Sequence, residues 1–371
     1  FSTALGEFLE RMITGLLDLN KKIIYKSAKQ LSETDDIVYP PKFHRQLPIQ
    51  KELYSYLNHS ENDVIAWVKA RNLVTKKDVY IPKKMTAWFS ENRKRTDKRF
   101  MNATTNGSAG YFSRTSATLR GLLEVVQRDA FLVHYLTMTA PQLIDVTTLP
   151  NDLQDKIKGI ASHGISLYIT NVTSIQIPSV TIVAINSEAV IKQVVVSAAS
   201  AVTFSEALGA ALKEMVLAQG MFYYTGTETE LAIIGNKSKP FVTPFGKNSR
   251  QLYWRGDDIV KEFEWFISGK KVSYNDLIKN ECAYKDDAEK LTYCIDVLQK
   301  MGEGYYPSVY FPKNKIQEKL GYYIAQVFIP KAFPFYLAEN YGTFDSDRLT
   351  EFSKSVGRES FTLNERPHMF S

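Results

Sequence analysis

The sequence is poor in cysteine and has no long apolar run. Only two cysteines, Cys282 and Cys294, occur among its 371 residues, and no histidine lies close to either in the chain. This spacing matches no metal motif and favours two free thiols in a reducing cytosol. No apolar run reaches the roughly 18 residues that a membrane helix needs, and no signal peptide is visible. We therefore expect a cytoplasmic protein without a membrane partner.

A large excess of charge is also absent. The formal net charge is +6, which is mild for this length and does not predict a nucleic-acid-binding protein. It would only help to attract an anionic small molecule or an acidic peptide. Apolar residues make up 44% and charged residues 23%, as in ordinary soluble globular proteins. The phosphate-binding patterns GxxxxGKS and GxxxxGKT and the kinase signatures are missing, so a nucleotide site would have to be built in another way.

The order of apolar patterns predicts an α/β or α+β protein with one extended core. Apolar residues at helical spacing predict helices at residues 3–17, about 115–136 and about 204–223. Short runs rich in β-branched residues predict strands at residues 65–73, 78–89, 165–172, 179–186, 192–201 and 321–330. Proline-containing residues 31–62 and the Gly/Asn/Ser/Thr stretch 102–110 predict loops, and the chain after residue 332 looks irregular.

The domain organisation follows from what joins these segments. No linker is long or polar enough to separate independent domains, so residues 1–371 are predicted to form a single domain. Phe1 is not a methionine, and helix-forming sequence begins almost at once. We therefore expect that an N-terminal segment precedes this chain.

Two predicted helices repeat one spacing of polar residues. The first set is Glu7, Glu10 and Arg11, and the second is Glu124, Gln127 and Arg128. Residues three and four apart share a helix face, so each set projects together. Surface ion pairs often have this spacing. Here, however, the flanking residues are strongly apolar, and the second set follows a Gly-rich loop whose backbone N–H groups could face a phosphate.

These residue types suit one kind of ligand. Magnesium prefers oxygen ligands, which it usually shares with substrate phosphates. Arginine forks match phosphate oxygens in pairs. Carboxylates that converge beside arginines therefore predict a site for Mg²⁺ and a polyphosphate without a Walker motif, with a surface ion pair as the alternative.

Three longer motifs resemble the YcaO family. They are STALGEFLER, TTNGSAGYFSRTSATLRGLLEVVQRDAF and FSEALGAALKEM, and they occur in the family's order. The late segments VFIPKAFPFYLAE and LNERPHMFS resemble the family's C-terminal region, so the resemblance extends from Phe1 to Ser371. It implies the YcaO fold, in which mixed sheets covered by helices surround a central nucleotide pocket.

The resemblance implies an enzyme that uses ATP and Mg²⁺ to act on peptide backbone amides. A cyclodehydratase of the azoline-forming, D-protein type phosphorylates an amide oxygen of a ribosomal precursor peptide. Addition of a Cys, Ser or Thr side chain to the same carbon then gives a thiazoline or oxazoline ring. Phosphorylation makes the amide oxygen a good leaving group, and the enzyme positions the reactants and stabilises charge. Two alternatives stay open: a thioamide- or amidine-forming enzyme, and a degenerate scaffold subunit.

The implied partners follow from this chemistry. The chain has no room for a fused E1-like or leader-binding module, so a separate protein of that kind would recruit the precursor peptide. A flavin dehydrogenase is a further implied partner, because it would oxidise azolines to azoles. A homodimer is also compatible with a core of this size.

The resemblance also implies residue roles. Glu7, Glu10, Glu124 and Glu214 match the carboxylates that organise Mg²⁺ and carry catalysis, and Arg11, Asn106, Gln127 and Arg128 match positions beside the nucleotide. Each has an ordinary alternative: Asn106 suits a simple Asn-Gly turn, and Glu214 suits an acid on a helix surface.

Two departures from the family pattern bear on activity. Gln127 stands where the family generally has Glu, and an amide brings no negative charge to a magnesium site. The tail Pro367–Ser371, with the sequence PHMFS, keeps only one proline of the family's proline-rich ending. Gln127 favours weaker binding of metal and nucleotide, the tail favours the thioamide- or amidine-forming alternative, and both departures favour the scaffold alternative.

Overall fold

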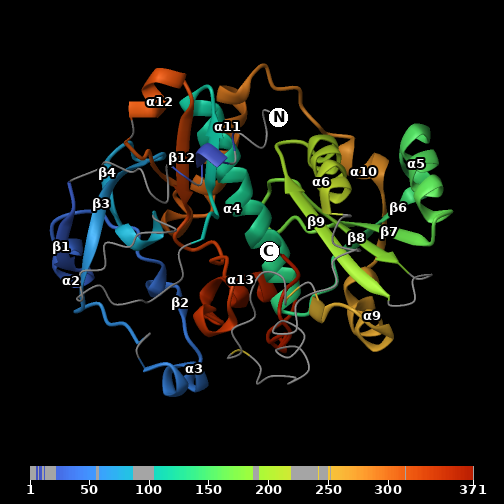
Figure 1. Ribbon diagram of the computed structural model, residues 1–371, viewed down its shortest axis with the longest axis horizontal. Helices are drawn as coiled ribbons and strands as arrows, with labels where there is room; N and C mark the ends of the chain where they lie inside the picture. Colours follow the sequence, from blue (N-terminus) through green and yellow to red (C-terminus); the bar gives the residue numbers. More distant parts are fainter. Residues whose placement is uncertain are drawn as a thin grey trace. The chain divides into compact units, whose positions relative to one another are not determined.

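The computed structural model describes residues 6, 8–10, 12, 22–55, 58–86, 104–186, 192–218, 241, 250, 252–313 and 315–370. The chain divides into two compact units (Figure 1). The first comprises residues 1–128, 284–336 and 341–348, and the second comprises residues 129–283, 337–340 and 349–371. The boundary falls within the long helix α4 (Arg114–Leu136). Both units mix helices with sheets, so the predicted α+β class is confirmed.

The first unit is built on a six-stranded antiparallel sheet. The strands follow the order β1-β3-β11-β12-β5, and β4 also pairs with β3. Their bounds are β1 Ile24–Ser27, β3 Val64–Asn72, β4 Asp78–Pro82, β5 Ser108–Tyr111, β11 Ser308–Tyr310 and β12 Tyr323–Phe328. Sheet order therefore places β12, from late in the chain, directly beside β5.

Short helices and a small second sheet complete the first unit. The helices are α2 Ala28–Ser32, α3 Pro48–Leu53, α11 Asp287–Lys300 and α12 Lys315–Leu320, and the strands β2 His44–Arg45 and β13 Asp345–Ser346 form a pair. Trp67, in β3, is fully buried and packs with Leu31 and Tyr39. In a second apolar cluster, Val68 of β3 packs with Ile81 of β4. Neighbouring residues of β3 thus face different clusters, because side chains alternate along a strand.

The second unit contains a five-stranded sheet in the order β10-β6-β7-β8-β9. Its strands are β6 Gln142–Asp145, β7 Ile165–Asn171, β8 Ser179–Asn186, β9 Gln193–Ser200 and β10 Lys271–Ser273. Only β10 and β6 pair in parallel within this sheet. The helices are α5 Asn151–Ala161, α6 Phe204–Ala218, α9 Asp257–Phe263 and α10 Tyr274–Ile278, and α13 Asp347–Ser355 lies mostly in this unit.

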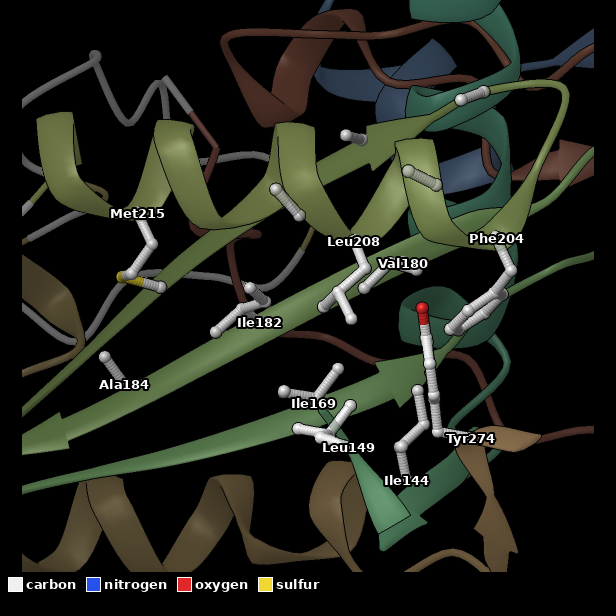
Figure 2. Packing of buried hydrophobic residues seen from close by; sticks show 14 of the residues in the cluster. Ile144, Leu149, Ile169, Val180, Ile182, Ala184, Phe204, Leu208, Met215 and Tyr274 are labelled. Atoms are coloured by element: carbon white, nitrogen blue, oxygen red, sulfur yellow. The ribbon is translucent and has the colours of Figure 1, made fainter. Parts of the chain in front are cut away.

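The core of the second unit forms between α6 and the sheet (Figure 2). Phe204, Leu208 and Met215 of α6 point toward Val180 and Ile182 of β8, and all five are buried. The three α6 residues are spaced by four and seven positions, so they lie on one face of the helix. Burial of a large apolar side chain stabilises by roughly 1.5–3 kcal/mol. This face therefore fixes α6 on the sheet.

Most predicted elements are confirmed. The helix expected at about 115–136 is α4, and the strands expected at 65–73, 165–172, 179–186, 192–201 and 321–330 correspond to β3, β7, β8, β9 and β12. The segment expected to be extended at 78–89 contains β4, which ends at Pro82 and is followed by a short 3-10 helix at Lys83–Met85. The described residues of the expected first helix are helical. The loop predictions were partly wrong, because α3 lies within 31–62, β5 begins at Ser108, and the helix α13 lies in the segment after 332 that was expected to be irregular. Within the described ranges, no helix is both long and apolar enough to cross a bilayer.

Candidate functional site

Glu124 joins helix α4 to the loop that precedes β5. Its Oε2 atom accepts a hydrogen bond from the backbone N–H of Gly107 at 3.2 Å. Gly107 has a φ of 78°, a left-handed conformation that favours glycine. A Cβ atom there would lie 2.2 Å from the carbonyl oxygen of Val327, and a Cβ at Gly121 would lie 2.4 Å from the carbonyl oxygen of Gly107. Two glycines therefore allow the loop to approach α4 closely enough for Glu124 to hold it.

Asn106 lies in the same loop, next to Gly107. Its Oδ1 atom is buried and has no hydrogen-bond partner among the residues that the structure describes. Asn106 lines a cavity of about 60 Å³, together with Thr104, Val125 and Phe335. A buried acceptor without a partner costs free energy, of the order of 1–3 kcal/mol. The loop thus presents an oxygen that a donor group, a water or a cation would satisfy.

Arg128 lies one helical turn after Glu124. Its Nη2 atom is 3.6 Å from Glu124 Oε1, and its guanidinium lies over the ring of Phe335, 4.2 Å from the ring centre. The two charged side chains are only 16% and 27% exposed, so this is not an ordinary surface ion pair. Gln127 lies beside them on α4 and is half-buried. The carboxylate and the ring therefore hold the Arg128 guanidinium in one orientation.

Glu10 belongs to the first unit as well, and it is half-buried. Its charge acts on Tyr322, which directly precedes β12. Burial raises the pKa of the Tyr322 phenol, the negative charge of Glu10 raises that pKa further, and the positive charge of Arg120 on α4 opposes the rise.

A family model described as "YcaO cyclodehydratase, ATP-ad Mg2+-binding" matches residues 2–332, which is most of the chain. The chain belongs to the YcaO family. The resemblance read from the motifs is confirmed. The predicted cofactors, ATP and Mg²⁺, are the ligands that the family description names. None of the curated proteins matches the sequence.

Solved structures share the fold of this YcaO chain at low sequence identity. A structure titled "Heterocyclase in complex with substrate and Cofactor" is 14% identical with a TM-score of 0.77, and the match covers 100% of this chain and 48% of that chain. YcaO from Methanopyrus kandleri, bound with AMPPCP and Mg²⁺, is 16% identical with a TM-score of 0.61. The match covers 89% of this chain and 75% of that chain. A chain of the E. coli microcin synthetase McbBCD complex with pro-MccB17 bound is 14% identical with a TM-score of 0.57. The match covers 99% of this chain and 87% of that chain. The chain spans about half the length of the first of these.

The structure brings together part of the predicted YcaO site. Glu124 and Arg128 meet on α4, and Asn106 directly precedes Gly107, which Glu124 contacts. Glu7 and Arg11 lie outside the described residues. Glu214 lies on α6 of the second unit, where it is exposed, and its expected meeting with the other carboxylates stays a prediction.

The metal ligands of the YcaO site also stay a prediction. Within the described ranges, no three or more side chains of His, Cys, Asp or Glu lie close enough together to hold a metal ion. Glu7 lies outside the described residues, and Mg²⁺ also accepts amide oxygens as ligands. The oxygen donors at the loop contact are the Glu124 carboxylate and the Asn106 amide, which is a chemically suitable pair for this ion.

The C-terminal tail of this YcaO chain is held through its backbone. The carbonyl oxygen of Pro367 accepts hydrogen bonds from the Tyr135 hydroxyl at 3.1 Å and the Trp254 indole N–H at 2.9 Å. Arg250 donates to the carbonyl oxygen of His368 at 3.4 Å. Phe370 packs edge-on against Phe131, with ring centres 4.5 Å apart. Backbone carbonyls fix the tail here, so the missing prolines are not needed to place residues 366–370; Ser371 lies outside the described residues.

Two further residues lie against β5 and were not predicted. Arg120 precedes Glu124 by four positions and Arg128 by eight, so the helical spacing was a signal that it shares their side of α4. Tyr322 carried no such signal, because only the pairing of β12 with β5 brings it beside Gly110.

Proposed function

We propose that this chain is an ATP- and Mg²⁺-dependent cytoplasmic cyclodehydratase subunit. It converts Cys, Ser or Thr residues of a ribosomal precursor peptide into thiazoline or oxazoline rings. Family membership supports the use of ATP and Mg²⁺. The observation within the chain that carries the proposal is the contact between Glu124 and Gly107, which presents Asn106 beside a carboxylate.

The residues present fit the proposed ligands. The buried, unpaired Oδ1 atom of Asn106 suits Mg²⁺ or a donor group of the nucleotide. The Glu124 carboxylate accepts one backbone hydrogen bond through Oε2. A carboxylate has about four lone-pair sites, so that bond leaves capacity for a cation. Bound ATP supplies the phosphoryl group that turns the peptide amide oxygen into a leaving group.

Arg128 has the role of stabilising negative charge in this proposal. Its orientation is set before any ligand binds, because Glu124 and Phe335 contact it from two sides. Donors that are already oriented lower a barrier more effectively than donors that must reorganise during the reaction. Glu7, Glu10 and Glu214 complete the set of acidic residues, Arg11 adds a second arginine, and Gln127 lies beside the nucleotide.

The proposed partners are a ribosomal precursor peptide and a separate E1-like, leader-binding protein. Support comes from the McbBCD complex, a multi-protein assembly with pro-MccB17 bound. A flavin dehydrogenase would act after ring formation, and a homodimer is a further proposed state.

The decisive experiment combines the full chain with Mg²⁺, ATP, a precursor peptide and an E1-like, leader-binding protein. We expect phosphate release that depends on the peptide, and the loss of one water mass for each ring formed. Glu124→Gln should abolish both signals, whereas Glu318→Gln, which changes an exposed carboxylate of α12, should not. Replacement of oxygen by sulfur in the peptide would instead identify a thioamide-forming enzyme.

A second candidate function is a scaffold subunit that does not turn over ATP. The observation that favours it is Gln127, which removes one negative charge from the α4 face that carries Glu124. Peptide modification that requires the chain but tolerates Glu124→Gln would identify the scaffold role. Loss of modification with that variant would identify the enzyme.

A further inference from the structure

Arg120 occupies the side of α4 that also carries Glu124 and Arg128. The three residues follow each other at intervals of four, one helical turn apart. The Arg120 side chain is exposed, and its guanidinium lies over the ring of Tyr111 in β5, 4.4 Å from the ring centre. Stacking on a ring occupies the face of a guanidinium and leaves its N–H donors in the plane for another ligand. Arg120 is therefore oriented but keeps its fork.

Two glycines leave room for the Tyr322 hydroxyl. A Cβ atom at Gly6 would lie 2.7 Å from the Tyr322 hydroxyl oxygen, and a Cβ atom at Gly110 would lie 2.4 Å from it. Any larger residue at either position would collide with the phenol. The ring of Phe112 packs edge-on against Tyr322, with ring centres 5.3 Å apart. Segments from three parts of the first unit thus define where this hydroxyl lies.

Glu10 is the third member of the cluster. Gly6 lies against the Tyr322 hydroxyl, the described residues of this segment are helical, and Glu10 follows Gly6 by four positions, so the two lie on the same side of the segment. An exposed arginine on an aromatic ring is usually only a surface contact, and Arg114 on the same helix is an example. Arg114 lies over Phe311, 5.1 Å from the ring centre. Arg120 differs from Arg114 because two further groups belong to its cluster. One is the Tyr322 hydroxyl, which can donate a hydrogen bond, and the other is Glu10, a candidate magnesium carboxylate.

The position of Arg120 along α4 indicates which part of a ligand it would meet. One helical turn of four residues is about 6 Å long. Arg120 therefore lies about 6 Å along the axis from Glu124, which holds the loop of Asn106 and Gly107. A ligand that reaches from this loop to Arg120 must be extended and must carry negative charge at the Arg120 end. A nucleoside triphosphate has this form, with its charge concentrated on the terminal phosphate.

We propose that Arg120 and Tyr322 bind the terminal phosphate of the nucleotide, with Glu10 on the adjoining magnesium side. This inference rests on the proposed function, because it requires that ATP binds to this unit. Arg120 donates through its guanidinium fork, which suits phosphate oxygens, and Tyr322 donates through its hydroxyl. Both residues are binding residues that sequence analysis did not identify.

The test compares nucleotides that differ only in their phosphates. Dissociation constants for ATP, ADP and AMP are measured by calorimetry with Mg²⁺ on the full chain and on the variants Arg120→Ala, Arg120→Lys and Tyr322→Phe. We expect Arg120→Ala to weaken ATP binding about tenfold to a hundredfold and AMP binding hardly at all. Arg120→Lys should bind ATP with an affinity between those of the parent chain and Arg120→Ala, because lysine keeps the charge without the guanidinium fork. Tyr322→Phe should weaken ATP binding by less than about tenfold.

Arg114→Ala is the matched control, since it removes a similar exposed, ring-stacked arginine from the same helix. It should leave all three constants unchanged. The inference is overturned if the parent chain binds ATP but Arg120→Ala and Tyr322→Phe bind it normally, or if they weaken AMP as much as ATP. Failure of the parent chain to bind ATP at all would overturn the proposed function, and this inference with it.

Discussion

The Glu124 carboxylate and the Gly107 backbone N–H are 17 residues apart in the chain and joined by a 3.2 Å hydrogen bond. One side chain therefore has two tasks. It fixes the loop that carries Asn106, and in the proposed function it also provides negative charge for Mg²⁺. These tasks require different properties of the residue, because a backbone N–H needs only an acceptor whereas a cation is held mainly by charge.

Variants of Glu124 should separate these tasks. Glu124→Gln keeps an acceptor for Gly107, so we expect a free energy of unfolding within about 1 kcal/mol of the parent chain, together with Mg²⁺-dependent ATP binding weakened by at least about tenfold. Glu124→Ala should lose both the hydrogen bond to Gly107 and the negative charge, so we expect its free energy of unfolding to fall by about 1–3 kcal/mol and its ATP binding to weaken as well. Urea denaturation and calorimetry provide the two readouts. Normal ATP binding by Glu124→Gln would show that the carboxylate is purely structural.

The close approach of the loop to α4 should depend on Gly107. Gly107→Ala places a Cβ 2.2 Å from the Val327 carbonyl oxygen in a left-handed backbone conformation, so we expect it to lower the free energy of unfolding by more than about 2 kcal/mol. Gly159→Ala is the control, because that glycine lies inside α5 with open space at its Cβ position. It should stabilise the protein by about 0.5–1 kcal/mol. Equal effects of the two changes in thermal or urea unfolding would contradict the packing described for the loop.

The amide of Gln127 should limit nucleotide turnover. Gln127→Glu restores a negative charge on the α4 face beside Glu124, so we expect tighter Mg²⁺ and ATP binding and faster phosphate release. Phosphate release with precursor peptide and partner protein present measures this. Gln299→Glu, on the exposed side of α11, is the control for a general effect of added charge. Unchanged or slower turnover in Gln127→Glu would count against a charge deficit at this position.

A buried ion pair should stabilise the second unit. Arg250 and Glu339 have side chains that are 0% and 4% exposed, with a 2.8 Å contact between Nη2 and Oε1. Arg250→Met removes this contact and the hydrogen bonds that Arg250 donates to the carbonyl oxygens of Leu337 and His368, so we expect a loss of about 3–5 kcal/mol in the free energy of unfolding. The double change with Glu339→Leu should recover at least about 1 kcal/mol of this loss, as urea denaturation would measure. Additive effects of the two single changes would show that the pair is not coupled.

The two cysteines should differ in reactivity. Burial raises the pKa of the Cys294 thiol to about 12, whereas Cys282 is exposed. At pH 8 the buried thiol stays protonated and inaccessible, so iodoacetamide should modify one thiol in the native protein and two in urea, as counted by mass spectrometry. As pH rises above the ordinary thiol pKa, the unfolded state loses a proton that the native state keeps, so stability should fall. Native modification of both thiols would contradict the burial of Cys294.

Local sequence patterns predicted those helices and strands whose own residues favour that conformation. The helix α4 carries apolar residues at helical spacing over 23 residues, and β7, β8 and β9 are rich in β-branched residues. Such patterns predict structure without knowledge of the tertiary contacts, because they reflect backbone preference and one buried face. By contrast, β5 has the sequence Ser-Ala-Gly-Tyr and is a strand because it pairs with β12 over its whole length. Its conformation is imposed by a neighbour more than 200 residues away.

The sequence by itself determined the α+β class, the motifs that identify the YcaO family, and the candidate residues on α4, because helical spacing decides which residues share a face. Only the tertiary structure decided that Glu124 holds Gly107 and that Arg120 stacks on the ring of Tyr111. It also decided that the tail is fixed by donors to its backbone. The physical reason is the same in each case. These contacts join backbone groups and aromatic rings from distant segments, and no local preference encodes which segments a sheet will bring together.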